Sequence, residues 1–305
     1  GIAVCAAIGL GKARDPLSAT LTSASALNIL QTTTPREVRY CCVKNNILLA
    51  LGFSRDVGAA QIIKDVLQSK KEPVLLRAYA ALAAGYISAD PDLPKLLKAI
   101  IADKDDAEVR SCACLALGNL KDTTAVPILG KVLNFGERDG KKEAPSVRAF
   151  AALALGRLGT KEALSELKKC AQTTEKDTDV RSAVVVALGM MELPEARDII
   201  VPFLQDRTMV IRGLAAVSLA QTKDKKACEL IIEALHRNKS NEADGLMAIA
   251  LGLTGQDKAK EELHRILENE KTRDLLRSAA AIGLGLLKDT SAVPVIVNIL
   301  KNAKI

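Results

Sequence analysis

The feature that most constrains this chain is a ten-residue apolar segment that recurs along almost its whole length. In one clear copy, at residues 109–118, it reads VRSCACLALG, and most copies lie about 33 residues apart. Nine copies can be recognised, and their last residues are 11, 52, 85, 118, 156, 189, 220, 252 and 285. A motif repeated at this period is typical of a solenoid, in which each repeat packs on its neighbours.

A second amphipathic segment lies between successive copies. Examples are VPILGKVL at 126–133 and EELHRILE at 261–268, where apolar residues recur with the helical period. Each repeat is therefore predicted to be a helix A, a turn and a helix B, and helix B carries the recurring segment. Glycines close many copies, at positions where glycine commonly ends a helix: Gly118, Gly156, Gly189 and Gly252. No stretch alternates with period two, so we expect no strands.

The helix B pattern V-R-x-x-A-x-x-A-L-G resembles the short HEAT-like repeats first noted in phycobilisome lyases. The resemblance covers essentially the whole chain. It implies an all-α, right-handed α-solenoid of about nine two-helix HEAT-like repeats, forming a single domain over residues 1–305. It says little about function, because this repeat occurs in proteins of many roles.

The two ends of the sequence lack the polar caps that usually close a solenoid. The chain opens inside a predicted helix B and closes after a predicted helix A at 292–301. We interpret the chain as a fragment of a larger protein, or as one whose ends pack on another chain, which includes a homo-oligomer.

A basic residue occupies the second position of most copies, beginning with Lys44. Six arginines there form what we call the Arg ladder: Arg77, Arg110, Arg148, Arg181, Arg212 and Arg277. A guanidinium holds a carboxylate through two parallel hydrogen bonds. We therefore expect pairing with a turn carboxylate or a helix-end carbonyl, and the candidate acids are Asp106, Asp179, Asp206 and Asp274. The alternative is a row of phosphate-binding cations, which Asp244 weakens because it reverses the charge in one copy.

An apolar series lies five residues after the ladder position on helix B. We call it the B stripe, and its members are Leu49, Leu82, Leu115, Leu153, Val186, Val217, Ile249 and Ile282. A helix that is apolar all round is normally buried. The B stripe therefore either packs between neighbouring repeats or forms an exposed groove on the concave side, where a partner helix or extended segment would bind.

Two intervals between copies are longer than the others. The first contains residues 18–37, which we interpret as a lengthened helix pair and its turn. The second contains NFGERDGKKEAPS at 134–146, a polar segment predicted to be an exposed loop. It is either a tolerated surface insertion or a contributor to partner binding. Its candidate contacts are Arg138, Lys141 and Lys142.

The sequence offers little chemistry. Its two histidines, His236 and His264, are expected to face solvent. The seven cysteines are odd in number and lie mostly in apolar helical patterns, which favours reduced thiols and a cytoplasmic location. No phosphate-binding loop, nucleophile elbow or metal-ligand spacing is present, so we expect no catalytic residues, no metal and no cofactor.

These observations favour a non-catalytic scaffold that binds another protein or another domain of the same protein. Nucleic-acid binding is the main alternative, because the net charge is +7 and basic clusters occur at Lys70-Lys71 and Lys223 to Lys226. Only 2% of residues are aromatic, however, which leaves few side chains for base stacking. An enzyme resembling a bilin lyase is the third possibility. No apolar run reaches about 18 residues, so no membrane span is expected.

Overall fold

The computed structural model describes residues 38–55, 57–103, 105–135, 137–138, 141–173, 175–237 and 241–302. The first copy of the motif, at 2–11, and the long interval at 18–37 lie outside these residues. Within the described part of the chain, no helix is long and apolar enough to cross a membrane.

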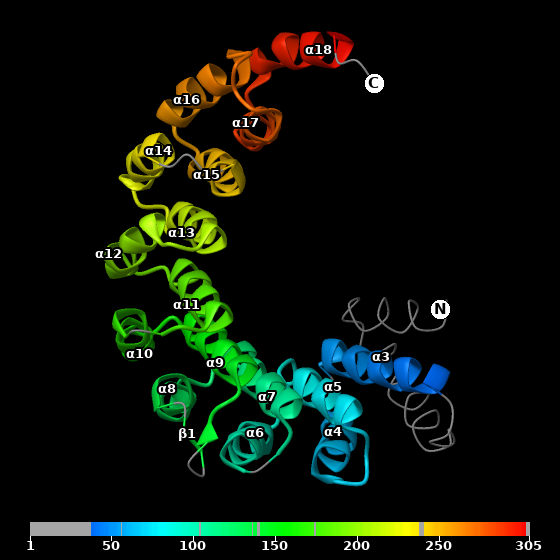
Figure 1. Cartoon of the computed structure of the whole chain (residues 1–305). Helices are drawn as coiled ribbons and strands as arrows, with labels where there is room; N and C mark the ends of the chain where they lie inside the picture. Colours follow the sequence, from blue (N-terminus) through cyan, green and yellow to red (C-terminus); the bar gives the residue numbers. More distant parts are fainter. Residues whose placement is uncertain are drawn as a thin grey trace. The chain divides into compact units, whose positions relative to one another are not determined.

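The described helices alternate between the two predicted types (Figure 1). The B helices are α3 (Val38–Ser54), α5 (Val74–Ala84), α7 (Ala107–Asn119), α9 (Pro145–Leu158), α11 (Thr178–Gly189), α13 (Met209–Gln221), α15 (Asn241–Thr254) and α17 (Asp274–Leu286). The A helices are α4 (Gly58–Gln68), α6 (Asp92–Ala102), α8 (Val126–Phe135), α10 (Lys161–Gln172), α12 (Glu195–Ile200), α14 (Ala227–Arg237), α16 (Asp257–Glu268) and α18 (Val293–Asn302). Short 3-10 turns precede α8 at Thr123–Ala125 and α18 at Thr290–Ala292, and another follows α12 at Val201–Gln205.

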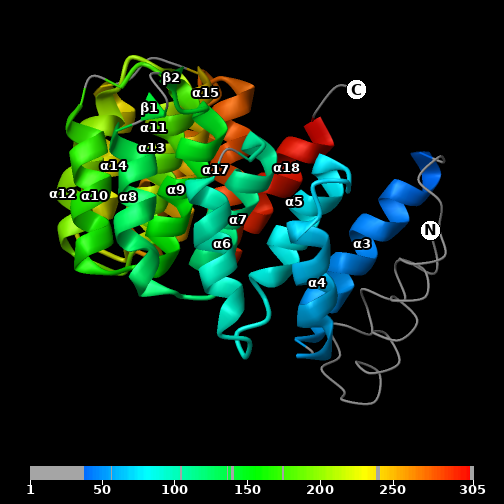
Figure 2. The same ribbon diagram turned by 90° about the horizontal axis from the view of Figure 1, so that it is seen from below.

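The chain divides into two compact units, residues 1–166 and 167–305. In the first unit, α3, α5, α7 and α9 pack on one another in sequence, and α4, α6 and α8 cover α5, α7 and α9 (Figures 1 and 2). In the second unit, α11, α13, α15 and α17 form the same kind of row, and α12, α14 and α16 pack against it. Each unit is thus a layer of B helices beside a layer of A helices, which is the all-α, HEAT-like solenoid arrangement predicted from the period.

A repeated glycine sets the distance between successive B helices. A Cβ atom built on Gly85 would lie 2.7 Å from Cα of Ala116, and one built on Gly118 would lie 2.9 Å from Cα of Ala154. The glycine near the end of one motif therefore contacts the small residue six positions after the ladder position of the next helix. Any larger residue would force the two helices apart.

These glycines lie at or just after the ends of their helices, as the sequence predicts, but they do not supply the left-handed residue that ends a helix. Positive φ occurs instead one or a few residues later, at Arg55, Lys121, Gly159, Lys223, Gly255 and Lys288. The motif glycines therefore stand near helix ends, as predicted, and their additional role is close packing between helices.

The loop within the insertion at 134–146 is shorter than the sequence predicts. Helix α8 continues to Phe135 and α9 already begins at Pro145. Between them, strand β1 (Glu137–Arg138) pairs antiparallel with β2 (Lys141–Lys142), with Arg138 opposite Lys141. The expectation of no strands was wrong at this hairpin, because two-residue strands are too short to produce an alternating pattern.

Candidate functional site

The Arg ladder connects each repeat to the next, and Arg77 shows how. Its Nε and Nη2 atoms donate to the carbonyl oxygen of Leu67, at the end of α4, both at 3.2 Å. Its Nη1 atom donates to Oδ1 of Asp105 at 2.8 Å, and Nη2 also pairs with that carboxylate. The side chains of Arg77 and Asp105 are only 3% and 2% exposed. Because Asp105 lies in the turn before α7, one buried guanidinium joins a helix A, a helix B and the following repeat.

Asp105 is held ionised by this contact. Burial opposes its ionisation, but hydrogen bonds from Arg77 and Lys70 outweigh burial and hold the pKa of Asp105 well below its usual range. A buried pair of this kind is strongly destabilised when one partner is removed. The Arg77 position therefore contributes to the stability of the joint between repeats.

Arg110 makes the same set of contacts one repeat later. Its Nε atom donates to the carbonyl oxygen of Ile101 at 3.2 Å, and its terminal nitrogens donate to the two oxygens of Glu143 at 2.7 and 2.5 Å. In the second unit Arg181 pairs with Asp206. The helix-end carbonyl contact also recurs at Arg148 and Arg277, which donate to Leu133 and Leu267 respectively.

Of the four acids predicted for the ladder, the structure places Asp206 at a ladder arginine. Asp106, Asp179 and Asp274 are exposed residues at the start of their own B helices, and the carboxylates bound in the first unit are Asp105 and Glu143. The predicted pairing with turn carboxylates and helix-end carbonyls is confirmed, but at Arg77 the acid is Asp105 and not the neighbouring Asp106. The binding carboxylate belongs to the turn before helix B rather than to its first turn.

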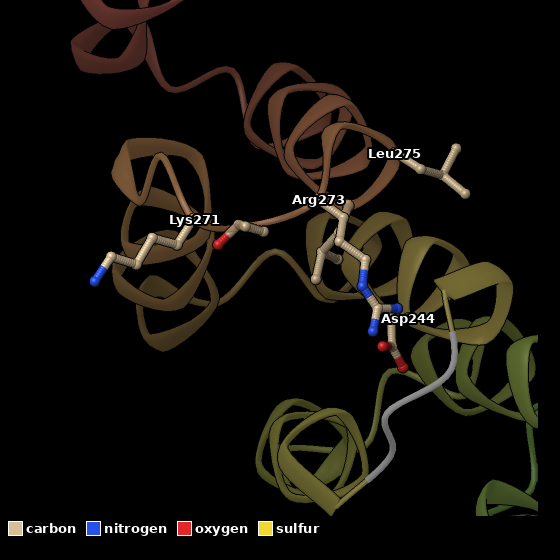
Figure 3. A pocket seen from close by; sticks show the side chains of 6 residues that line it. Asp244, Lys271, Arg273 and Leu275 are labelled. Carbon is tan, nitrogen blue, oxygen red and sulfur yellow. The ribbon is translucent and has the colours of Figure 1, made fainter.

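One position of the ladder is reversed in charge. Asp244 of α15 stands where the other copies have a basic residue, and it is 7% exposed. Its Oδ1 atom has no hydrogen-bond partner. Arg273, in the turn before α17, points toward Asp244 across a cavity of about 230 Å³ that is also lined by Lys271 and Thr272 (Figure 3).

Burial raises the pKa of Asp244, although the positive charges of Arg273 and Arg212 act in the opposite direction. In this repeat the acid, Asp244, lies on helix B and the base, Arg273, lies in the turn before the next helix B, which is the reverse of the Arg77–Asp105 arrangement. Without a hydrogen bond to Oδ1, this joint is weaker than the one formed by Arg77.

A second series of ion pairs, which the sequence analysis missed, connects the A helices. A basic side chain on one A helix reaches the aspartate that precedes or begins the next A helix. The pairs are Lys64–Asp90 at 2.9 Å, Lys98–Asp122 at 2.9 Å, Arg197–Asp224 at 3.0 Å and His264–Asp289 at 2.9 Å. The recurring aspartate at the beginning of each A segment is the sequence signal that could have revealed them.

His264 therefore does not simply face solvent. Its side chain is 23% exposed, and its Nε2 atom lies 2.9 Å from Oδ2 of Asp289. His236 is 51% exposed and lies 2.9 Å from Oε1 of Glu262, which also binds Arg265. Among the described residues, no group of three or more His, Cys, Asp or Glu side chains could hold a metal ion.

The surroundings of His264 include a hydroxyl and a second carboxylate. Oγ of Ser291 lies 3.2 Å from Nε2, and Oε1 of Glu268 lies 3.4 Å from Nδ1. An earlier repeat has the same arrangement with Lys98 in place of the histidine and Thr124 in place of the serine. The contacts of His264 are thus those of a joint between A helices that a lysine also forms elsewhere in the chain.

The B stripe is partly exposed in both units. In the first unit Leu49, Leu82, Leu115 and Leu153 are all half-buried, and in the second Val186, Val217 and Ile249 are half-buried while Ile282 is 53% exposed. The residues directly before them in the sequence are almost all buried, and these include Leu48, Ala81, Cys114, Ala152, Val185, Ala216 and Ala248. The fourth position after the ladder is thus buried, whereas the B stripe beside it is only partly covered.

Further half-buried apolar residues adjoin the B stripe. They lie three residues before its members and include Tyr79, Cys112, Phe150, Leu214 and Leu246. Residues three apart share one face of a helix. Each unit therefore presents a two-residue-wide apolar row on its B helices. The side chains of Arg138, Lys141 and Lys142 lie outside the described residues, so their role as loop contacts stays a prediction.

Cys112, Cys114 and Cys228 are free thiols. Cys114, Cys170 and Cys228 are buried, and burial raises the pKa of Cys114 to about 12 and that of Cys112 to about 11. Thiols with such pKa values are protonated near neutral pH and are poor nucleophiles.

Sequence comparison identifies the class of protein that this geometry defines. A model of HEAT repeats matches residues 70–140, 140–220 and 175–244, which together make up more than half of the chain. A model of the PBS lyase HEAT-like repeat matches residues 276–302. The chain belongs to the HEAT-repeat family. No curated protein sequence matches it.

Several solved structures are similar to this chain. The YibA protein of Escherichia coli has 18% identity and a TM-score of 0.51, over 86% of this chain and 92% of that chain. The complex of CpcE and CpcF of phycocyanin lyase from Nostoc sp. PCC7120 has 23% identity and a TM-score of 0.48, over 80% and 94%. Human deoxyhypusine hydroxylase in complex with glycerol has 19% identity and a TM-score of 0.38, over 90% and 99%. At 18% identity the likeness to YibA concerns the fold alone.

Proposed function

We propose that this HEAT-repeat chain is a protein-binding scaffold, and that its B stripe receives an apolar helix or extended segment of a partner protein. The observation that carries the proposal is the partial exposure of the B stripe, since seven of its eight members are half-buried and Ile282 is more exposed still. Side chains in this state still bury apolar area when a partner covers them.

The spacing of the B stripe suits a helical partner. Leu82, Leu115 and Leu153 come from successive B helices of one unit. Packed helices lie about 8–10 Å apart. An amphipathic helix that crosses the B helices would therefore meet a new apolar contact at each repeat. We extend the same reasoning to the second unit, with Val217 and Ile249 in the equivalent places.

Charge does not favour nucleic acid as the occupant. Lys70, a member of one basic cluster, binds Asp103 and Asp105 at 3.4 and 2.8 Å. Lys98 pairs with Asp122, and Lys258 pairs with Glu229. Lysines neutralised by nearby carboxylates contribute little to phosphate binding.

The test is capture of a partner by variants that carry a charge on the B stripe. The partner would be isolated with the wild-type chain, purified and titrated against Leu115→Asp and Leu153→Asp. Each variant should weaken binding by at least about tenfold, because a charge would be buried without a partner. Native helical content, followed by circular dichroism, must be retained in both variants.

Val57→Asp provides the matched control. Val57 is 54% exposed, lies in the same unit and does not belong to the B stripe. It should bind like the wild type. Equal loss of binding in all three variants, or unfolding of both B-stripe variants, would refute the proposed site.

A further inference from the structure

The cavity between Asp244 and Arg273 lies between two B helices that pack on one another, α15 and α17. It has a volume of about 230 Å³. The other residues that line it belong to α17 or to the turn before it, and they are Lys271, Thr272, Leu275 and Leu276. Pockets for drug-sized ligands measure about 300–1,000 Å³, so this cavity suits a smaller molecule.

The cavity lies at a joint that a buried ion pair closes in an earlier repeat. Arg77 and Asp105 connect a ladder position on helix B with the turn before the next helix B, and their side chains are 3% and 2% exposed. Asp244 and Arg273 stand at the corresponding places with the charges reversed. An aspartate side chain is much shorter than an arginine side chain, so the ladder position of this repeat leaves space that a guanidinium fills elsewhere.

Asp244 contributes an unused hydrogen-bond acceptor to the cavity. It is 7% exposed, and its Oδ1 atom has no hydrogen-bond partner. Arg273 points toward this carboxylate (Figure 3) but does not donate to Oδ1. A buried charged group without a partner is costly, whereas an ammonium group that donated to it would form a charge-assisted hydrogen bond. Asp244 therefore favours a ligand with a cationic donor.

Arg273 contributes the opposite charge. It is an exposed residue of the turn, and its guanidinium can hold a carboxylate through two parallel hydrogen bonds. A ligand with only a positive charge would be repelled by Arg273 and Lys271, and a ligand with only a negative charge would be repelled by Asp244. The lining therefore favours a small ligand that carries both charges close together.

We propose that this cavity binds a free α-amino acid with an apolar side chain. The ammonium and carboxylate groups of an α-amino acid are attached to one carbon atom, so they can reach an acid and a base that face each other. The ammonium group donates to Oδ1 of Asp244, and the carboxylate accepts from Arg273. The apolar side chain lies against Leu275 and Leu276, which form the apolar part of the lining.

The test is isothermal titration calorimetry of the whole chain with leucine as the probe. We expect saturable binding at one site per chain. Two analogues each lack one charge: isoamylamine has no carboxylate, and isocaproate has no ammonium group. Each should bind at least about tenfold more weakly than leucine, as is typical for loss of a hydrogen bond between charged groups.

Three variants locate the binding. Asp244→Asn keeps the shape of the side chain without its charge, and it should weaken leucine binding by at least about tenfold. Arg273→Gln should weaken leucine binding but not isoamylamine binding, because the amine has no group that pairs with Arg273. Arg207→Gln is the matched control, since Arg207 is an exposed arginine in the turn before α13, and it should bind leucine like the wild type.

The proposal would be overturned by the absence of saturable leucine binding, or by leucine binding that Asp244→Asn leaves unchanged. Equal binding of leucine and isocaproate would also overturn it, because the cavity would then be an anion site alone. Retained helical content in each variant is checked by circular dichroism. None of these results bears on the B stripe, which none of the variants changes.

Discussion

The motif glycine gives the sharpest test of how consecutive repeats are held together. Gly118 and Gly285 are both the twelfth residue of a thirteen-residue B helix, α7 and α17. A Cβ atom on Gly118 would lie 2.9 Å from Cα and 3.2 Å from Cβ of Ala154, whereas one on Gly285 would meet nothing within 4 Å. Alanine at the two positions therefore changes the same local helix preference but only one packing contact.

Two opposing effects determine the result of Gly118→Ala. Alanine is favoured over glycine inside a helix by about 0.8–1.0 kcal/mol. Overpacking against a neighbouring backbone costs about 1–3 kcal/mol. Gly285→Ala keeps the favourable effect alone, so it should stabilise the chain by up to about 1 kcal/mol. Because the helix preference cancels in the comparison, the free energies of unfolding of the two variants should differ by about 1–3 kcal/mol.

The assay is urea denaturation followed by circular dichroism at equal protein concentration. Equal changes in the two variants would contradict the packing role of the motif glycine. If the glycines instead ended their helices in a left-handed conformation, both substitutions would destabilise the chain, because alanine tolerates positive φ poorly.

Three further predictions concern charge. Asp105→Asn removes the acid bound to buried Arg77 and should cost about 3–5 kcal/mol in urea denaturation. The pKa of Asp105 is lowered in the folded state, so its carboxylate stabilises the fold fully above about pH 4 and less on further acidification. The free energies of unfolding of the variant and the wild type should therefore converge in acid. Asp244→Asn should raise the midpoint of thermal unfolding at pH 7, with a gain of roughly 1 kcal/mol from removing a buried carboxylate whose Oδ1 atom has no hydrogen-bond partner. Because the folded pKa of Asp244 is raised, this gain should shrink as the pH falls through that pKa, and a constant gain at all pH values would contradict the assignment. His264→Lys should preserve the ion pair with Asp289, because Lys98 forms the same pair with Asp122. Thermal unfolding at pH 7 should therefore show no loss of stability. A loss as large as that of His264→Ala would argue against the equivalence of His264 and Lys98.

The fold could be predicted from the sequence because a solenoid depends on local repetition. The 33-residue period and the two amphipathic segments are visible without any knowledge of distant contacts. The role of the motif glycine was not predictable in the same way. Gly118 stands near a helix end, where glycine often terminates a helix. Its packing role is visible only in the structure, where a Cβ atom built on Gly118 would lie 2.9 Å from Cα of Ala154 in the following repeat.

The ion pairs were only partly predictable for a similar reason. The sequence identifies the arginines of the ladder, but it cannot choose between neighbouring acids such as Asp105 and Asp106. The choice depends on which carboxylate points back toward the preceding repeat, and that is set by the turn before helix B. The ion pairs between A helices, such as Lys98 with Asp122, were not predicted, because the basic residue does not lie at a constant number of residues from its aspartate.

The B stripe shows both what periodicity can predict and what it cannot. The series from Leu49 to Ile282 was found from spacing alone, and two alternatives were open for it: packing between repeats or an exposed groove. The structure buries the residues one position earlier, such as Cys114 and Ala152, and leaves the B stripe partly exposed. Identification of the partner lies beyond any pattern of this kind, because it depends on a second molecule.

The most direct test of the B stripe as a binding site is photo-crosslinking in native extract. A photoreactive phenylalanine analogue would replace Leu115 in one variant and exposed Val57 of the same unit in another. The account predicts a defined crosslinked partner with the probe at 115 and none with the probe at 57. The same partner crosslinked equally from both positions, or from Val57 alone, would contradict the assignment of the B stripe as the binding surface.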